Sequence, residues 1–165
     1  MKRLIFFFIL IPNILFAESM KAIGVKGKEE NVDRVIKISM YDNYYQPNKF
    51  KVKNKETIKF VVENKGQLVH EFNIATKEMH LKHQPEMMMM VENEIILVDK
   101  IDKQKMKEMS KKNPAMAHSH SNSVLLSPGE SAELIWKFSN TVDIEAACNV
   151  PGHYDVGMIA KIDNI

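Results

Sequence analysis

Cysteine is nearly absent from this chain of 165 residues, in which Cys148 is the only one. A single cysteine cannot form an internal disulfide, so a fold held together by disulfides is excluded. A lone thiol in an oxidising compartment is a liability unless it is buried or ligated. We therefore expect Cys148 to be held by its surroundings or by a ligand.

Long apolar runs are also scarce. The run at residues 4–11 follows Lys2 and Arg3 and is followed by the small residue Ala17. This pattern predicts a secretory signal peptide over residues 1–17, and it is too short to span a bilayer comfortably. An uncleaved N-terminal anchor is the alternative, and a lipoprotein anchor is excluded because no cysteine follows the run. The sequence therefore predicts export to the periplasm.

The chain also lacks a large excess of either positive or negative residues. Its 23 basic residues include Lys2 and Arg3, so removal of residues 1–17 would leave 21 basic against 21 acidic residues. A nucleic-acid binder needs a basic excess, and this class of partner is excluded. The remaining length is enough for one domain with a real core, which we expect to be a monomer.

What is present is a pattern of short strands. Residues 18–33 are polar and are expected to be a flexible leader, and from Arg34 onward apolar and polar residues alternate, as in "VIKISM". Turn signals such as Pro47-Asn48, Lys65-Gly66 and Pro128-Gly129 separate these segments. Strands are predicted at about residues 34–40, up to Val52, at 57–63 and 68–75, on both sides of Pro128-Gly129, and in "TVDIEAACN" and "VGMIAKID". The spacing predicts an all-β domain over residues 34–165, an antiparallel sandwich or barrel.

Residues 76–122 interrupt this pattern and are rich in methionine and histidine. The stretch "DKIDKQKMKEMSKK" favours a helix that begins near Asp99 or Asp102. Pro85 and Pro114 are expected to break the segment into pieces. We interpret it as a partly helical insertion into the β domain, with the four-methionine run at 87–90 serving as packing.

The stretch "CNVPGHYDVGM" contains three kinds of metal ligand at equal steps: Cys148, His153 and Met158. A soft thiolate, a borderline imidazole and a weak thioether, completed by a second histidine, make the trigonal site with a long axial bond that is associated with blue copper. A turn at "PGHY" would let all three side chains converge from one hairpin loop. His70, which follows a glycine-containing turn at the start of a strand, is the natural fourth ligand.

A zinc site, a catalytic cysteine and a buried structural thiol are the alternatives for this loop. A zinc site would favour more cysteine or histidine and would rarely recruit methionine. A cysteine nucleophile would need a histidine base and an oxyanion hole, and would leave Met158 unexplained. A buried structural thiol would leave the histidine and the methionine there by chance.

With "VHEFNI", "LSPGESAELIWKF" and "GMIAKI", this loop resembles the cupredoxins, the blue type 1 copper proteins, and most closely the small exported cupredoxins associated with bacterial copper tolerance. The resemblance covers roughly residues 34–76 and 122–163. It implies a Greek-key β-sandwich and one type 1 copper ion bound by His70, Cys148, His153 and Met158. The insertion is longer than in these relatives.

The leading functional expectation is a copper protein that cycles between Cu(I) and Cu(II), either as an electron carrier or in copper handling and tolerance. Its partners would be copper and a periplasmic redox partner or a copper exporter. The rival is a copper chaperone or sequestering protein without a redox centre, although such sites do without a thiolate. An enzyme is not expected, because copper oxidases and nitrite reductases need further histidine clusters.

The insertion favours copper handling, since thioethers select Cu(I) and imidazoles accept either oxidation state. A second, weaker and exposed copper site is predicted there. Met116, His118 and His120 alternate and would face one side of an extended segment. The candidate ligands are His80, His83, Met116, His118 and His120.

Overall fold

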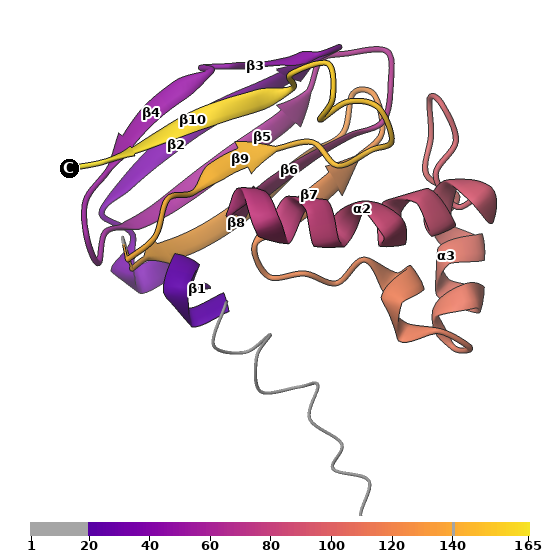
Figure 1. Ribbon diagram of the computed structural model, residues 1–165, viewed down its shortest axis with the longest axis horizontal. Coiled ribbons are helices and arrows are strands. Elements are labelled where there is room, and N and C mark those ends of the chain that lie inside the picture. Colours follow the sequence, from indigo (N-terminus) through magenta and orange to yellow (C-terminus); the bar gives the residue numbers. More distant parts are fainter. Residues whose placement is uncertain (1–19, 140) are drawn as a thin grey trace, which may run out of the picture.

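The computed structural model describes residues 20–139 and 141–165, which form two β-sheets packed face to face (Figure 1). The expected signal peptide, residues 1–17, lies outside the described residues. The first sheet has the order β1-β8-β5-β2-β3 and the second has the order β4-β10-β9-β6-β7. The strands are β1 (Gly24–Lys26), β2 (Arg34–Tyr41), β3 (Tyr44–Gln46), β4 (Lys49–Val52), β5 (Thr57–Asn64), β6 (His70–Ala75), β7 (Ser123–Leu126), β8 (Ser131–Phe138), β9 (Glu145–Ala147) and β10 (Ile159–Asn164).

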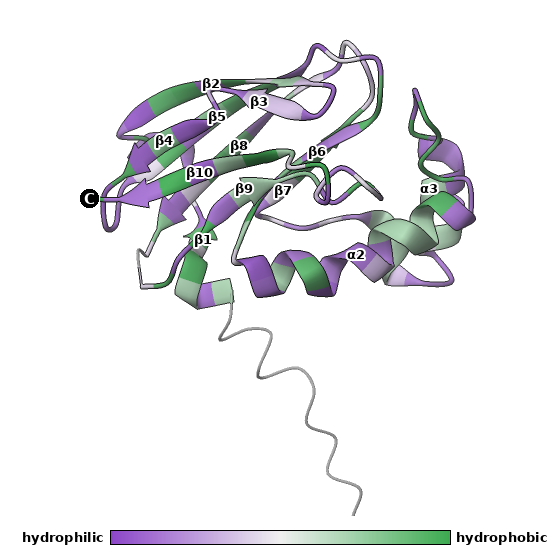
Figure 2. Ribbon diagram, turned by 45° about the horizontal axis from the view of Figure 1, so that its top comes forward, coloured by the Kyte–Doolittle hydropathy of each residue, from purple (hydrophilic) through white to green (hydrophobic). Residues whose placement is uncertain are grey.

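The alternation in the sequence places the core between the sheets. In β2, Ile38 and Met40 are buried whereas Lys37 is exposed, as a strand with one face in the core requires. Aromatic rings fill the centre, with Phe60 at 5.3 Å from Phe72 between ring centroids. The alternating hydropathy is visible along the strands in Figure 2. The expected Greek-key β-sandwich is confirmed.

Two strand pairs run parallel, which corrects the expectation of a purely antiparallel arrangement. Strand β2 pairs with β5, and β10 pairs with β4, in parallel register. Parallel neighbours need a crossover connection instead of a tight hairpin. Between β2 and β5 the chain first forms β3 and then crosses to the second sheet as β4, so β5 returns in the direction of β2.

Part of the segment expected as a flexible leader, residues 18–33, belongs to the sandwich instead. Strand β1 pairs antiparallel with β8, and a short 3-10 helix, η1 (Glu29–Asn31), follows it. Ile23 is fully buried, and its carbonyl accepts a hydrogen bond of 3.2 Å from Trp136 Nε1. The polar composition of the segment concealed this strand, because it is short and is held by its pairing with β8.

The insertion is partly helical, as predicted. It contains α2 (Lys77–Glu92), α3 (Lys103–Ser110) and the 3-10 helix η2 (Pro114–Ala117). Thr76 caps α2 by accepting a hydrogen bond from the Met79 N–H, and Asp102 caps α3 in the same way from Lys105. Within residues 20–139 and 141–165, no helix has the length and apolar character needed to cross a membrane.

Pro85 lies inside α2, so the expectation that it breaks the segment is wrong. A proline in a helix loses the hydrogen bond to the carbonyl four residues earlier, here that of Leu81. Leu81 is 49% exposed, so the loss falls on the side of the helix that faces water. Met87 and Met90 on the other side are fully buried, which confirms the packing interpretation for these two methionines.

Helix α2 lies over the outer face of the second sheet at its β6 and β7 end (Figures 1 and 2). Strand β6 consequently has six buried residues, because one face packs on the core and the other lies under the insertion. Alternation along β6 sends His70 and Phe72 to one face and Glu71 and Asn73 to the other. As a result, His70 and Glu71 lie next to each other in the sequence but on opposite faces of the second sheet.

Candidate metal centre

The loop that joins β9 to β10 brings its ends together through its own backbone. Cys148 follows β9, and its N–H donates a hydrogen bond of 3.2 Å to the carbonyl of Met158, the residue before β10. The Met158 N–H donates in turn to the His153 carbonyl at 3.0 Å. Gly152 and Gly157 have φ of 86° and 89°, values that L-residues with side chains rarely adopt. The sequence of the loop therefore closes it as predicted.

His70 completes a compact group of donor atoms with this loop. Cys148 Sγ lies 3.3 Å from His153 Nδ1 and 4.0 Å from His70 Nδ1, and the two Nδ1 atoms are 3.2 Å apart. Three ligands about 2.0–2.3 Å from one ion lie roughly 3.5–4 Å apart in a trigonal plane. Two imidazole nitrogens and one sulfur at these separations fit a copper ion with small adjustments.

Met158 is the last residue of the loop between β9 and β10. The distances among Cys148, His153 and His70 do not show whether its thioether is a ligand. The residue is fully buried, and its described hydrogen bonds are those of its backbone. A thioether forms a weak axial bond in this kind of site. The assignment of Met158 as the axial ligand therefore stays a prediction.

Asp42 orients the imidazole of His70. Its Oδ1 lies 2.9 Å from His70 Nε2 and also accepts a hydrogen bond of 3.0 Å from the Gln67 N–H. With Nε2 donating to a carboxylate, the lone pair of a neutral His70 is on Nδ1, which faces Cys148 and His153. Gly66 makes this approach possible, since a Cβ there would lie 2.9 Å from His70 Nε2 and closer still to Asp42 Oδ1.

In the metal-free protein, the Cys148 thiol and the His153 imidazole are both neutral at ordinary pH. Burial raises the pKa of the Cys148 thiol to about 12, against the hydrogen bond that Sγ accepts from the Glu71 N–H at 3.3 Å. Burial, together with the neighbouring His70, lowers the pKa of His153 to about 4. A cation bound here would supply the positive charge that a buried thiolate needs, so the site favours a metal that displaces the thiol proton.

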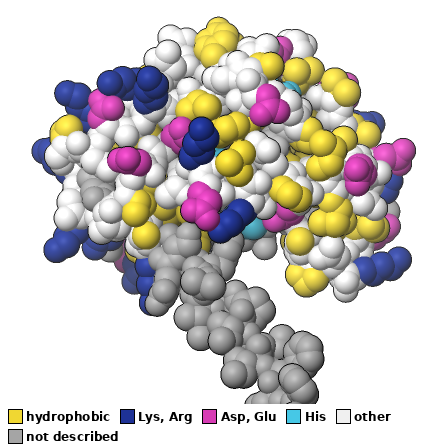
Figure 3. Space-filling model, viewed as in Figure 1, with side chains coloured by type: hydrophobic (Ala, Val, Ile, Leu, Met, Phe, Trp, Pro, Cys, Tyr) yellow, Lys and Arg dark blue, Asp and Glu magenta, His cyan; other side chains and the backbone are white. Residues whose placement is uncertain are grey.

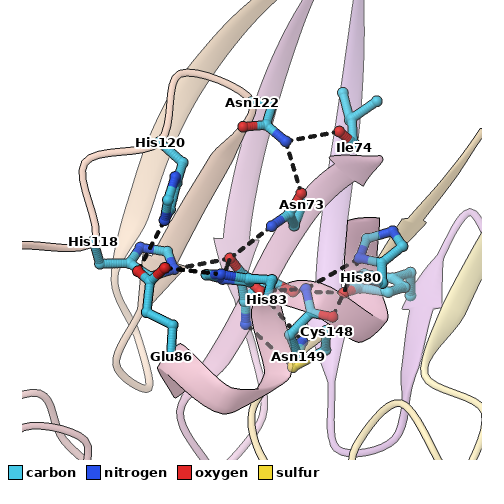
Figure 4. Close-up of polar contacts among 12 residues, drawn as sticks. Asn73, Ile74, His80, His83, Glu86, His118, His120, Asn122, Cys148 and Asn149 are labelled. Carbon is cyan, nitrogen blue, oxygen red and sulfur yellow. Dashed lines mark hydrogen bonds and ion pairs between the residues drawn. The ribbon is translucent and has the colours of Figure 1, made fainter. Parts of the chain in front are cut away.

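A second group of histidines lies on the other face of β6, around two carboxylates (Figure 4). His83 from α2, with His118 and His120 from the loop after η2, offer ligand atoms that all lie within 4.8 Å of one another. Glu71 Oε1 lies 2.9 Å from His118 Nε2 and 3.2 Å from His83 Nε2. Glu86 Oε1 lies 2.9 Å from His120 Nε2.

The two carboxylates and the histidines stabilise each other's charges. Burial alone would raise the pKa of Glu71, but hydrogen bonds from His118 and His83 keep it well below its ordinary value. Burial likewise opposes protonation of His83, yet Glu71 and Glu86 raise its pKa to about 10. The group is therefore a buried ionic network in the metal-free protein.

The structure corrects the predicted ligands of the insertion. Met116 lies in η2 and is buried, and His118 has a left-handed φ of 44°, so the expected extended alternation of Met116, His118 and His120 does not exist. His80 is apart from the cluster, with its Nδ1 at 3.2 Å from the Asn149 side chain. The histidines are also less exposed than predicted, from 3% for His118 to 29% for His120.

Four residues at these sites were not found from the sequence: Glu71, Glu86, Asn149 and Asp42. Glu71 had a signal, since a carboxylate in the middle of the apolar strand "VHEFNI" requires partners. Asn149 follows Cys148, and its Nδ2 donates to Glu71 Oε2 at 2.7 Å. Asp42 lies in a turn 28 residues before His70, and no local pattern connects the two.

Comparison with known proteins agrees with this geometry. The "Copper-resistant cuproprotein CopI" of Pseudomonas aeruginosa is 33% identical over 98% of this chain and 96% of its own length. The protein of the same name from Vibrio cholerae is 26% identical over 88% of this chain and 74% of its own length. Both similarities extend through most of the two chains, so they include the insertion as well as the sandwich.

Solved structures show the same fold. Auracyanin from Roseiflexus castenholzii has a TM-score of 0.56 with 17% identity, and covers 81% of this chain and 98% of its own. An azurin from Methylomonas has a TM-score of 0.51 with 13% identity, and covers 81% and 99%. The family model described as "Cupredoxin-like domain" matches residues 7–106, well over half of the sequence. The resemblance first drawn from the loop at Cys148 is thus confirmed, and the chain belongs to the cupredoxin-like family.

Proposed function

We propose that this protein is a periplasmic type 1 copper protein that cycles between Cu(I) and Cu(II) and serves in copper tolerance. The observation that carries the proposal is the grouping of Cys148 Sγ, His153 Nδ1 and His70 Nδ1 within 4.0 Å of one another. The copper ion would supply the one-electron chemistry. The names of the relatives, copper-resistant cuproproteins, support copper tolerance over a purely respiratory carrier.

The fold holds these ligands in one geometry. His70 begins β6 and Cys148 follows β9, two strands that pair in the same sheet. Asp42 holds the far nitrogen of His70, and the Glu71 N–H donates to Cys148 Sγ. Because each of these two ligands is fixed by packing and by a further hydrogen bond, both oxidation states would experience nearly the same site, which favours electron transfer.

A surface for a redox partner or a copper exporter borders His153. A cavity of about 420 Å³ is lined by apolar residues of the ligand loop and of the insertion, among them Val150, Pro151, Ile96 and Val98. In the space-filling view, hydrophobic side chains are exposed over the end of the molecule that carries α2 and α3, whereas many lysines lie at the opposite end (Figure 3). We propose that a partner approaches His153 across this apolar surface.

The competing function is a Cu(I) chaperone or a sequestering protein without a redox-carrying role. Such a protein has no use for a thiolate that is buried and supported by a backbone N–H, as Cys148 is.

Replacement of Cys148 by Ser tests the proposal. Copper-loaded wild-type protein should absorb strongly in the visible through charge transfer from the Cys148 thiolate to Cu(II), and the variant should be colourless. Lys65→Ala, an exposed change near His70, is a control that should keep the colour. A Cys148→Ser protein that stays blue or green would end the type 1 assignment. Export is tested separately: the periplasmic fraction should contain a chain that begins after Ala17.

A further inference from the structure

We propose that His83, His118 and His120 form a second copper site, and that Glu71 connects it to the Cys148 site. The choice of copper as the metal rests on the proposed function. The ligand set and the connection rest on the geometry of the described residues alone. Figure 4 shows His83, His118 and His120 gathered near Glu86, with Cys148 and Asn149 beside His83.

The three histidines of the cluster offer ligand atoms that all lie within 4.8 Å of one another. The Nε2 atoms of His118 and His120 are each engaged by a carboxylate at 2.9 Å. Their Nδ1 atoms have no hydrogen-bond partner among residues 20–139 and 141–165. This is the arrangement of metal-ligating histidines, in which an outer carboxylate holds one ring nitrogen and leaves the other for the ion. His83 would release its longest contact, 3.4 Å from Nδ1 to Glu86, to join them.

The charge of the cluster also suits a cation. Glu71 is fully buried and Glu86 is 18% exposed, and both direct an oxygen at the histidines. A buried carboxylate requires a positive partner. A metal ion bound at the histidines would supply such a partner.

A cavity beside the cluster indicates how the ion enters and what it is. The cavity measures about 80 Å³, and His83, Glu86 and His120 line it together with Met20 and Met79. That volume accommodates an ion with one or two waters. Thioethers beside imidazoles favour copper, because zinc sites rarely recruit methionine and hard cations prefer oxygen.

Glu71 contacts both sites through different atoms. Its carboxylate lies 2.9 Å from His118 Nε2 and accepts a hydrogen bond of 2.7 Å from Asn149, the neighbour of Cys148. Its backbone N–H donates to Cys148 Sγ at 3.3 Å. Alternation along β6 produces this arrangement, since His70 turns to the first site and Glu71 to the second.

A metal ion bound by the histidines would therefore change the environment of Cys148 Sγ through Glu71. Drawing the Glu71 carboxylate toward the cluster changes the N–H hydrogen bond on Cys148 Sγ. Hydrogen bonds to a ligating sulfur tune its donation to the metal. Occupation of the second site should consequently shift the visible band of the first.

The test is anaerobic titration of the metal-free full chain with Cu(I), and separately with Cu(II). Wild-type protein should bind two equivalents, with a shift of the visible band as the second equivalent of Cu(II) binds. His118→Asn/His120→Asn should bind one equivalent and keep the colour. Cys148→Ser should bind one equivalent without colour. Met116→Leu, the matched control for a nearby residue that lies outside the cluster, should still bind two.

The connection is tested with Glu71→Gln. This variant keeps the shape of the side chain and the backbone N–H, so the protein should remain coloured. Loss of this outer carboxylate should weaken the second site by about 10–100-fold. Once saturated, that site should no longer shift the band. The same shift in wild type and Glu71→Gln would refute the connection.

Further outcomes separate this inference from the proposed function. A coloured wild-type protein that saturates at one equivalent would refute the second site and leave the type 1 assignment intact. A colourless wild-type protein that still binds copper through these histidines would refute the type 1 assignment and leave the second site intact. Stronger binding of zinc than of copper by the Cys148→Ser variant would show that the metal assigned to the cluster is wrong.

Discussion

Gly66→Ala is the sharpest test of how His70, the proposed copper ligand, is positioned. A Cβ at this residue would lie 2.9 Å from His70 Nε2 and 3.1 Å from the Asp42 nitrogen, and closest of all to Asp42 Oδ1. The His70 contact alone is about 0.6 Å shorter than an ordinary one. Both neighbours are held, His70 by burial and Asp42 by the N–H groups of Gln67 and Leu68. The added methyl group must therefore disturb the hydrogen bond between Asp42 and His70.

The expected magnitude follows from overpacking and from that hydrogen bond. Overpacking costs about 1–3 kcal/mol of stability, and a weakened hydrogen bond to the ligating histidine lowers metal affinity about 10–100-fold. Urea unfolding of the metal-free protein measures the first effect, and copper competition with a chelator measures the second. Gln67→Ala is the control, because it keeps the backbone N–H that binds Asp42.

A double-mutant cycle with Asp42→Ala isolates the cause. Removing the carboxylate removes the closest clash, so Gly66→Ala should destabilise the Asp42→Ala protein by about half as much as it destabilises wild type. Equal destabilisation in both backgrounds would mean that the contact with the Asp42 carboxylate contributes nothing, and that the remaining contacts with His70 Nε2 and the Asp42 backbone nitrogen cause the effect. Wild-type copper affinity in Gly66→Ala would refute the positioning of His70 by Asp42.

Three further predictions follow from packing, charge and ligand chemistry. Met158→Gln should keep copper and lower the reduction potential, measured by redox titration, whereas complete loss of copper would make Met158 a full ligand. Met87→Ala should cost about 2–5 kcal/mol in urea unfolding because it empties a buried site, while Met88→Ala, on the 45% exposed neighbour, should cost much less. Burial alone would raise the pKa of Glu86, but His120 and His83 lower it to about 2 from an ordinary 4.5. The stabilisation by the ionised Glu86 carboxylate is therefore present above about pH 4.5 and is lost as the pH falls toward 2. Metal-free Glu86→Gln protein should consequently lose less unfolding free energy across that window than wild type. Equal loss in the two proteins would exclude this contribution.

The sandwich could be predicted because its signals are local. Strands β2, β5 and β8 alternate between apolar and polar residues, and turn residues separate them. Helix α3 was also predicted, since Asp102 stands at its start and caps it. In contrast, β1 is three residues long and depends on its pairing with β8. The parallel register of β2 with β5 depends on a crossover through the second sheet.

Helix α2 shows where local signals failed. Pro85 argues against a helix at that position, and the methionine run has no clear apolar face. Burial of Met87 and Met90 against the rest of the protein offsets the hydrogen bond that Pro85 removes. Tertiary packing therefore overrode the local preference.

The amino-acid sequence by itself determined the loop of the first site. Cys148, His153 and Met158 lie within one connection between two strands, so their spacing alone brings them near one another, and the position of His70 on a strand marked it as the partner. The second cluster was decided only by tertiary structure. His83 and His118 are 35 residues apart, and α2 and the loop after η2 must both pack over β6 before the two rings come within 5.4 Å between centroids. The outward turn of Glu71 beneath them depends on the register of β6 with β9, which no short stretch of sequence contains. Ligands from one loop need only a local turn, whereas ligands from separate elements need the packed insertion and the sheet together.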